Sequence, residues 1–352
     1  MIKIRGTSEG VQTMFSNTVP NITTRRHSFF TRKKLPIAQI RGCQSTMQQW
    51  KVEQPYLKVS GNLLEGPFYD GKADQARFID IKERYLYTFS PSKGPESLKK
   101  VKTDDVLGVT ANIKGSSNLI VGAKYGFGKM DAETGKVEYL KKVATWDDRA
   151  KDEKLRSNDG AVDSRGRFWV GTMNDAAQWD KEGSFYRLDP DLSVHLMLTG
   201  VCAPNGMGWS PDEKVMYWTD SEDHVIYGFD FDVKTGSIGV GVNEDKSRKA
   251  FYKVEEKDWF PDGAVVDWEG CVWTAIWGGN RVLRVSPEGK RIGEVLLPTK
   301  YVTCPEFIGT KLLITTRRDP DILEDCVERG GDVYLVDVGV TGPQKHEFHF
   351  AT

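Results

Sequence analysis

Three oxygen-bearing side chains recur at one position of a repeated sequence pattern. Asn158, Asn205 and Asp262 each lie eight residues before the turn position of a repeat, and a glycine follows each of them within two positions. Glu65, which Gly66 follows, occupies the comparable place before an earlier and less regular turn. Carboxylate and amide oxygens are hard ligands that favour Ca²⁺, Mg²⁺ or Mn²⁺, although Zn²⁺ also accepts carboxylates. No Cys or His shares this position, so the pattern predicts an oxygen-lined site for one divalent cation, with Ca²⁺ the first choice by ligand type.

A structural explanation competes with this prediction for each residue taken alone. Asn-Gly and Asp-Gly are common turn dipeptides, and such residues also occur at strand ends. The shared position in the repeat favours a site over independent turns, provided that the fold brings the repeats together.

The repeat itself is a turn followed by a short apolar strand. The stretch 163–171 parallels the stretch 267–275, with Gly166 or Gly270 in the turn and Trp169 or Trp273 three residues later. Similar turns fall near residues 70, 116, 164, 212, 268 and 310, which gives a period of about 42–56 residues. A period of this length with several strands per unit is typical of a β-propeller blade. Six copies therefore predict an all-β, six-bladed β-propeller.

This architecture explains how distant residues could form one site. The innermost strand of each propeller blade lines the central channel, so residues at the same position of the repeat meet around that channel. We expect a strand near Tyr56–Ser60 to complete the last blade and close the ring, leaving no long free edge.

The composition excludes several classes of protein. The chain has 352 residues, of which 39% are apolar and 28% charged, and its net charge is −1. This balance argues against a nucleic-acid-binding protein, and no apolar run approaches the roughly 18 residues that span a bilayer. The five cysteines are odd in number and include no C-x-x-C pair, which favours a reducing compartment over a disulfide framework.

The first 46 residues differ from the rest of the chain. They hold eight Lys or Arg, eleven Ser or Thr and one acid, Glu9, whereas the remainder carries a net charge of −8. An Arg-rich and acid-poor segment is typical of an organellar transit peptide, but a disordered extension or a true start at Met47 explains it as well. We therefore expect an amino-terminal extension over 1–46, a propeller over 47–352, and an intracellular protein, either cytoplasmic or mitochondrial.

Five segments resemble the senescence-marker-protein/gluconolactonase/luciferin-regenerating-enzyme (regucalcin-like) family. They are Leu64–Asp70, Arg156–Met173, Pro204–Asp212, Pro261–Gly270 and the closing Gly331–Val340. The resemblance runs from about Gln48 to Phe350 and implies a six-bladed propeller with one catalytic divalent ion in its channel. The activity that it implies is metal-dependent hydrolysis of a sugar lactone, with Ca²⁺, Zn²⁺ or a related ion.

The resemblance also assigns roles to individual residues. It carries the family's metal ligands onto Glu65, Asn205 and Asp262, and its substrate contacts onto Arg156 and Asn158. The chain departs from the family at one place, because many members have a small residue where this chain has Glu306. That carboxylate could touch the channel rim or face solvent, and the substrate depends on which it does.

Lactone hydrolysis needs a polarised carbonyl, a water nucleophile and a proton acceptor. A divalent cation supplies a Lewis acid and lowers the pKa of a coordinated water. We expect Asp262 to combine ligation with general-base duty, while Glu65 and Asn205 fix the ion. Arg156 offers five rigid donors to sugar hydroxyls or to a developing carboxylate, and Asn158 donates to the substrate.

Two other functions remain open on the same residues. One is a propeller phosphotriesterase-like or aryl-ester hydrolase that uses the same metal, and the other is a non-enzymatic calcium-handling propeller. Arg156 and Asn158 favour a polyhydroxylated substrate, and the ring of oxygen ligands argues against a pure interaction module. The expected partner is thus a small-molecule sugar lactone, with no nucleic acid and no membrane, and the oligomeric state is not defined by the sequence.

Overall fold

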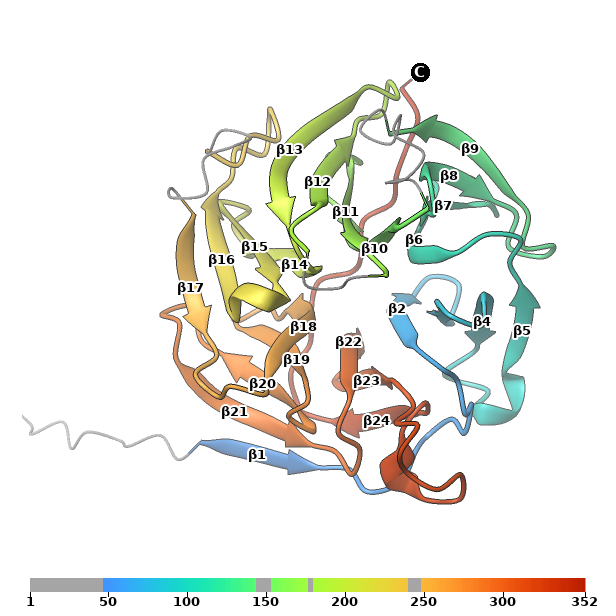
Figure 1. Ribbon diagram of the computed structural model, residues 1–352, viewed down its shortest axis with the longest axis vertical. Helices are drawn as coiled ribbons and strands as arrows, with labels where there is room; N and C mark the ends of the chain where they lie inside the picture. Colours follow the sequence, from blue (N-terminus) through green and yellow to red (C-terminus); the bar gives the residue numbers. More distant parts are fainter. Residues whose placement is uncertain (1–46, 144–152, 177–179, 240–247, 352) are drawn as a thin grey trace, which may run out of the picture. The chain divides into compact units, whose positions relative to one another are not determined.

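The part of the chain that the structure describes folds into six β-sheets arranged around a central channel (Figure 1). The computed structural model describes residues 47–143, 153–176, 180–239 and 248–351. The extension predicted over residues 1–46 lies outside them. Secondary structure in the described part consists of strands and short 3-10 helices, and none of its helices has the length and apolar character that crossing a membrane requires. The predicted all-β, six-bladed propeller is confirmed.

Each blade takes consecutive strands of the chain in antiparallel order, beginning at the channel, and blade 5 adds the parallel strand β1 at its outer edge. Blade 1 contains β2 (Leu64–Asp70), β3 (Gln75–Asp80), β4 (Tyr85–Phe89) and β5 (Lys99–Lys102), with η1 (Pro95–Ser97) before β5. Blade 2 contains β6 (Leu107–Asn112), β7 (Leu119–Ala123), β8 (Gly126–Met130) and β9 (Val137–Lys142). Blade 3 contains β10 (Leu155–Val162), β11 (Phe168–Asn174), β12 (Gly183–Leu188) and β13 (Val194–Val201).

The other three blades follow the same order. Blade 4 contains β14 (Pro204–Trp209), β15 (Val215–Asp220), β16 (Val225–Asp230) and β17 (Lys249–Lys253), with η3 (Ser221–Asp223) after β15. Blade 5 contains β18 (Phe260–Val266), β19 (Val272–Trp277), β20 (Arg281–Val285), β21 (Arg291–Leu296) and, outermost, β1 (Gln48–Lys51). Blade 6 contains β22 (Val302–Ile308), β23 (Lys311–Thr316) and β24 (Val333–Asp337), with η5 (Val327–Arg329) before β24.

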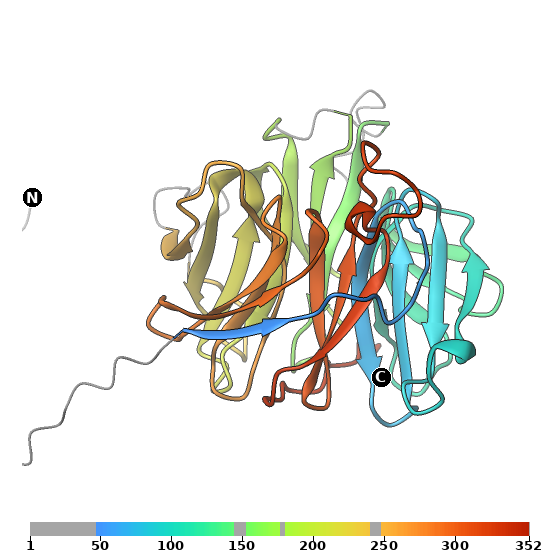
Figure 2. The same ribbon diagram turned by 90° about the horizontal axis from the view of Figure 1, so that it is seen from below.

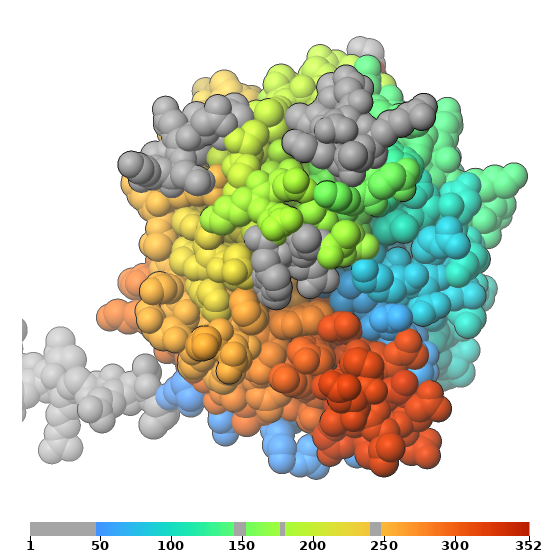
Figure 3. Space-filling view, viewed as in Figure 1, coloured from blue at the N-terminus to red at the C-terminus, as the bar shows by residue number. Residues whose placement is uncertain are grey.

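The innermost strands form a closed ring. Strands β2, β6, β10, β14, β18 and β22 each contact the next, and β22 returns to β2. In the space-filling view the colours pass around the face in chain order, with the last blade beside the first (Figure 3). Residues at the same height on these strands therefore surround one axis, as the repeat predicts.

The repeated turn has a physical reason that is visible in blades 3 and 5. Asp163 accepts a hydrogen bond from Trp169 Nε1 (2.9 Å), and Asp267 accepts the equivalent bond from Trp273 (2.9 Å). Each aspartate also accepts backbone N–H bonds within its own turn, and each Trp is fully buried. The carboxylate thus closes the turn and satisfies the one polar atom of a buried indole, which is otherwise costly to bury.

A β-bulge interrupts every innermost strand near its start. The register shifts fall between Glu65 and Phe68 in β2, between Asn205 and Met207 in β14, and between Pro261 and Ala264 in β18. The pairing register of β6, β10 and β22 also shifts, beginning in the first half of each strand. A bulge re-aims side chains and often lies next to an active site. The bulges in β2, β10, β14 and β18 lie beside Glu65, Asn158, Asn205 and Asp262.

Ring closure differs from the expected strand over Tyr56–Ser60. This segment pairs with β24 through a single bridge, between Leu57 and Val333, and is not a strand. Asp332 draws the chain away from the ladder, because its carboxylate accepts the backbone N–H groups of Val59 (2.7 Å) and Ser60 (3.0 Å). Blade 6 therefore has three strands, and the sequence gives no signal for β1, which joins β21 in parallel at the edge of blade 5.

Candidate active site

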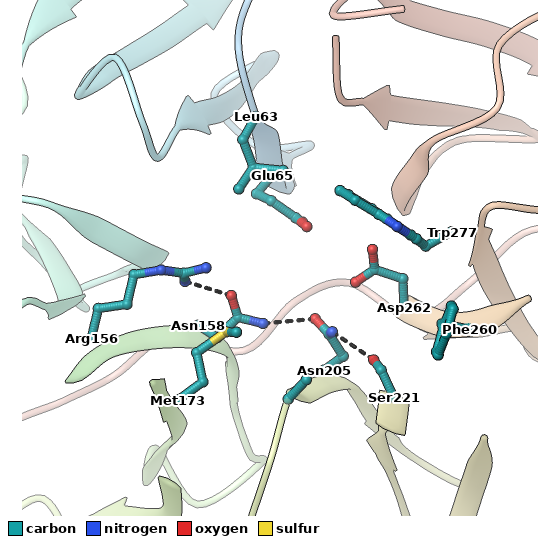
Figure 4. A pocket seen from close by; sticks show the side chains of 11 residues that line it. Leu63, Glu65, Arg156, Asn158, Met173, Asn205, Ser221, Phe260, Asp262 and Trp277 are labelled. Carbon is teal, nitrogen blue, oxygen red and sulfur yellow. Dashed lines mark hydrogen bonds between the residues drawn. The ribbon is translucent and has the colours of Figure 1, made fainter. Parts of the chain in front are cut away.

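All five residues predicted for the site line one cavity of about 90 Å³ at the channel mouth. They are Glu65 from β2, Arg156 and Asn158 from β10, Asn205 from β14, and Asp262 from β18 (Figure 4). The remaining walls are contributed by Leu63, Met173, Ala203, Ser221, Phe260 and Trp277. The residues come from the first half of their strands, so the cavity lies at one end of the channel.

A chain of hydrogen bonds fixes the amides in this cavity. Arg156 donates from an Nη to Asn158 Oδ1 (2.6 Å), and Asn158 Nδ2 donates to Asn205 Oδ1 (2.9 Å) and to Pro204 O (2.9 Å). Asn205 Nδ2 in turn donates to Ser221 Oγ (2.8 Å), as Figure 4 shows. Because Asn205 donates one amide N–H to Ser221 and accepts the N–H of Asn158, its amide is held in one orientation, with the oxygen at the centre of the cavity near Asp262 and Glu65 (Figure 4).

The chain of bonds extends across three blades. Ser221, the first residue of η3, donates its hydroxyl to the carbonyl of Pro261 (2.6 Å), the residue before Asp262. Glycines allow the backbones to approach this closely. A Cβ on Gly206 would lie 2.5 Å from Ala264 N, and one on Gly263 would lie 2.4 Å from Cys304 Sγ. This close contact explains why glycine follows Asn205 and Asp262.

Asp175 anchors the guanidinium of Arg156. The Nε of Arg156 donates to Asp175 Oδ1 (2.7 Å), and Lys82 contacts the same carboxylate (2.8 Å). Burial would raise the pKa of Asp175, but Arg156 and Lys82 outweigh it and lower the pKa to about 2. Arg156 is therefore held at the cavity wall by a permanently ionised partner.

Two buried carboxylates share the centre of the cavity. Figure 4 shows Glu65 and Asp262 pointing into one space, and both are more than nine-tenths buried. Burial, followed by repulsion from Asp159, raises the pKa of Glu65 to about 8. Burial and repulsion from Glu65 raise the pKa of Asp262 well above its usual range. Burial also raises the pKa of Asp159, which lies deeper in the channel, to about 6.

This donor set fits a hard divalent cation. Among the residues that the structure describes, the Glu65 carboxylate accepts one hydrogen bond, from Gly66 N–H (3.3 Å). Arg156 is the only basic side chain among the described residues that line the cavity, and it forms its ion pair with Asp175. Two buried acids that lack a cationic partner either hold protons or bind a cation. Two carboxylates and one oriented amide oxygen are the ligand types that calcium and similar ions prefer.

A second cluster of potential metal ligands is already neutralised. Asp267, Glu269 and Cys271 lie close enough to hold a metal, and no other such His/Cys/Asp/Glu group occurs among the residues that the structure describes. However, Arg284 contacts both carboxylates, at 2.8 Å to Asp267 and 2.6 Å to Glu269. The cluster therefore closes the repeated turn of blade 5 and offers little free charge to a cation.

The sequence reasoning missed several residues of the cavity. Ser221 and Asp175 orient predicted residues, yet neither stands at the repeated position, and a serine or aspartate after a strand carries no distinctive signal. Phe260 and Trp277 form an apolar wall, and Arg317 lies over the Trp277 ring at 5.1 Å from its centroid. Such apolar walls beside polar groups are typical of small-molecule sites.

Comparison with known proteins assigns the family. Residues 63–318 match the family profile described as the SMP-30/Gluconolactonase/LRE-like region. Regucalcin from Oryctolagus cuniculus is 33% identical over 291 residues, covering 79% of this chain and 92% of its own. A Bacillus subtilis (strain 168) protein, YvrE, named as a candidate sugar lactone lactonase, is 30% identical over 70% of this chain and 80% of its own. The chain therefore belongs to the SMP-30/gluconolactonase/LRE-like family.

Solved structures agree on the fold. The calcium-binding protein regucalcin from Agrobacterium tumefaciens str. C58 has a TM-score of 0.76 at 24% identity, covering 86% of this chain and 99% of its own. A luciferin-regenerating enzyme has a TM-score of 0.72 at 24% identity, covering 82% of this chain and 96% of its own. The expected family resemblance is confirmed.

Proposed function

We propose that this protein is a lactonase that hydrolyses a sugar lactone at the channel mouth with the help of one divalent cation. The observation that carries the proposal is the convergence of Glu65, Asn205 and Asp262 on one buried space beside Arg156 and Asn158. Family membership and the naming of YvrE as a candidate sugar lactone lactonase support the same reaction class.

Glu65, Asn205 and Asp262 would hold the cation through oxygen atoms. Ca²⁺ is the first choice for such ligands, and Zn²⁺, Mn²⁺ and Mg²⁺ accept them as well. When bound, the cation supplies Lewis-acid polarisation of the ester carbonyl and lowers the pKa of water.

The protein side chains then divide the remaining work. Asp262 accepts the proton of the attacking water, because it is a buried carboxylate that forms no ion pair with the side chains that the structure describes. Arg156, held by Asp175, donates hydrogen bonds to hydroxyls of the sugar and to the carboxylate that forms on ring opening. Asn158 is fixed between Arg156 and Asn205 and aligns the substrate against the ligand set. Phe260 and Trp277 exclude water from the apolar side of the cavity.

The decisive experiment compares two substrates with and without a chelator. We expect the purified protein to hydrolyse D-glucono-1,5-lactone above the spontaneous rate, to lose this activity in EDTA, and to regain it when Ca²⁺, Zn²⁺, Mn²⁺ or Mg²⁺ is added. Hydrolysis of paraoxon alone would favour a phosphotriesterase-like enzyme on the same residues. Cation binding without hydrolysis of either ester would favour a calcium-handling protein.

A further inference from the structure

The carboxyl-terminal strap, residues 343–350, crosses the end of the channel opposite the cavity. Figure 1 shows it running behind the innermost strands, and in Figure 2 it lies on the side where the turns after those strands project. Backbone hydrogen bonds join Phe348 to Asn112 and Lys114 of blade 2 (both 2.8 Å), and Phe348 is fully buried. Farther along, Ala351 N–H bonds Pro190 O of blade 3 (2.8 Å). The strap is thus part of the folded propeller and covers its channel floor.

One charged side chain of the strap reaches the channel. Lys345 Nζ lies 3.0 Å from Glu306 Oε2, and the Glu306 side chain is only 4% exposed. Glu306, on β22, is the residue at which the sequence departs from the family. Its carboxylate therefore faces neither solvent nor the channel mouth: it is paired with the strap at the channel floor.

The same lysine shares a cavity with Asp159, the residue that follows Asn158. This cavity of about 30 Å³ is lined by Lys345, Asp159, Gly66 and Cys304 among others, and its volume is enough to hold a water molecule. Asp159 in turn repels both Glu65 and Asp262 electrostatically. The ammonium of Lys345 attracts Asp159 and so acts on the ligand set from below.

We infer that Lys345 and Glu306 are positioning residues that set the cation affinity of the active site from the channel floor. The inference rests on the proposed function, since it assumes that Glu65, Asn205 and Asp262 bind a cation. Charges fixed in a poorly solvated channel act over longer distances than charges at the surface. Lys345 weakens cation binding by its own charge, and Glu306 strengthens it, so the intact pair keeps the affinity at an intermediate value.

Two single variants and their combination test this inference by calorimetric titration with Ca²⁺. We expect Lys345→Met to bind Ca²⁺ about three to ten times more tightly and Glu306→Gln to bind it weaker by a similar factor. The double variant should return to within about twofold of the original affinity, and Lys311→Met, at an exposed lysine of the same blade, should change nothing. High salt should weaken the shift caused by Lys345→Met more than the shift caused by Glu306→Gln, because the Lys345 side chain is 29% exposed and the Glu306 side chain only 4%.

A purely structural role of the pair gives a different pattern. If the pair only fastened the strap, both single variants would weaken Ca²⁺ binding, and this outcome would overturn the inference. Urea unfolding in EDTA of the original protein, the two single variants and the double variant measures the interaction energy of the pair without any cation. Purely additive effects of the two substitutions on the free energy of unfolding would contradict a direct interaction. Failure of the original protein to bind any divalent cation would overturn the proposed function and the affinity shifts, whereas coupling measured in urea would still identify the pair.

Discussion

Asn158 donates its side-chain amide to Oδ1 of Asn205 over 2.9 Å, across the boundary between the third and fourth blades. If the Asn205 amide were reversed, its NH₂ group would face the NH₂ group of Asn158, and two donors would meet. Its oxygen would then face Ser221 Oγ, and the hydrogen bond that Asn205 now donates to this hydroxyl would be lost. The orientation of the oxygen that faces Glu65 and Asp262 is therefore determined by neighbours on two other elements. The proposed cation ligand Asn205 thus depends on contacts between blades as much as on its own strand.

Ser221→Ala removes the hydroxyl that connects Asn205 with the carbonyl of Pro261. We expect Ca²⁺ affinity to fall several-fold, because the Asn205 amide loses the bond that orients it, and stability to fall by about 1–3 kcal/mol, because buried groups lose partners. Calorimetric titration and urea unfolding measure the two effects. Ser237→Ala, at an exposed serine of the same blade region, is the control. An unchanged Ca²⁺ affinity in Ser221→Ala would show that the bond does not orient the ligand.

Asp262→Asn preserves an oxygen ligand and the side-chain shape but removes the proton acceptor. We expect kcat for lactone hydrolysis to fall by about 10²–10⁴-fold. The metal-free fold should be retained or stabilised, since Asn keeps the shape of the side chain and replaces a carboxyl group whose ionisation is opposed by burial and by Glu65. Steady-state kinetics and thermal unfolding provide the measurements, with the exposed Asp258→Asn as control. Near-normal turnover by an Asp262→Asn variant that still binds the cation would exclude Asp262 as the base.

The sequence was sufficient to predict the blades and four polar residues of the cavity from one period, and the family resemblance added Arg156. Equal spacing before a turn places Asn158, Asn205 and Asp262 at equal height on neighbouring innermost strands, and closure of the ring brings them together.

Other features could not be predicted, since they depend on contacts between distant segments. The partnership of Glu306 with Lys345 requires the strap to cross the channel floor, and nothing near either residue indicates that path. Asp332 diverts the segment after Leu57 from β24, and β1 pairs with β21 about 240 residues away in sequence. Ser221 and Asp175 act through single hydrogen bonds that have no periodic signature.

The stability of the metal-free protein should depend on pH in a defined direction. Burial raises the pKa of Glu65 from 4.5 to about 8, so in this range the folded chain retains a proton that the unfolded chain releases. The stability contributed by this group is fully present below about pH 4.5 and is lost as the pH rises through about 8. Urea unfolding in EDTA between about pH 5 and about pH 8.5 should therefore show a larger loss for the original protein than for Glu65→Gln.

Saturating Ca²⁺ should reverse this trend for the original protein. A cation replaces the protons on Glu65 and Asp262, so the stabilisation by Ca²⁺ should grow with pH over the same range. Glu65→Gln should show a smaller gain, because it has one carboxylate fewer. Equal pH dependence of the two proteins in EDTA, or Ca²⁺ stabilisation that does not increase with pH, would contradict the assignment of Glu65 to the ligand set.

Asp175→Asn tests whether Arg156 must be anchored to recognise the substrate. The substitution retains the shape of the side chain but removes the charge that Nε of Arg156 contacts at 2.7 Å. We expect KM for the lactone to rise about tenfold, because the guanidinium is less firmly positioned, while Ca²⁺ affinity changes little, because Arg156 is not among the proposed ligands. Lys82→Met removes the other basic partner of Asp175, at a partly exposed position, and should leave KM within about twofold. A rise in KM of similar size in both variants would indicate that the surface pair, and not the anchoring of Arg156, determines substrate binding.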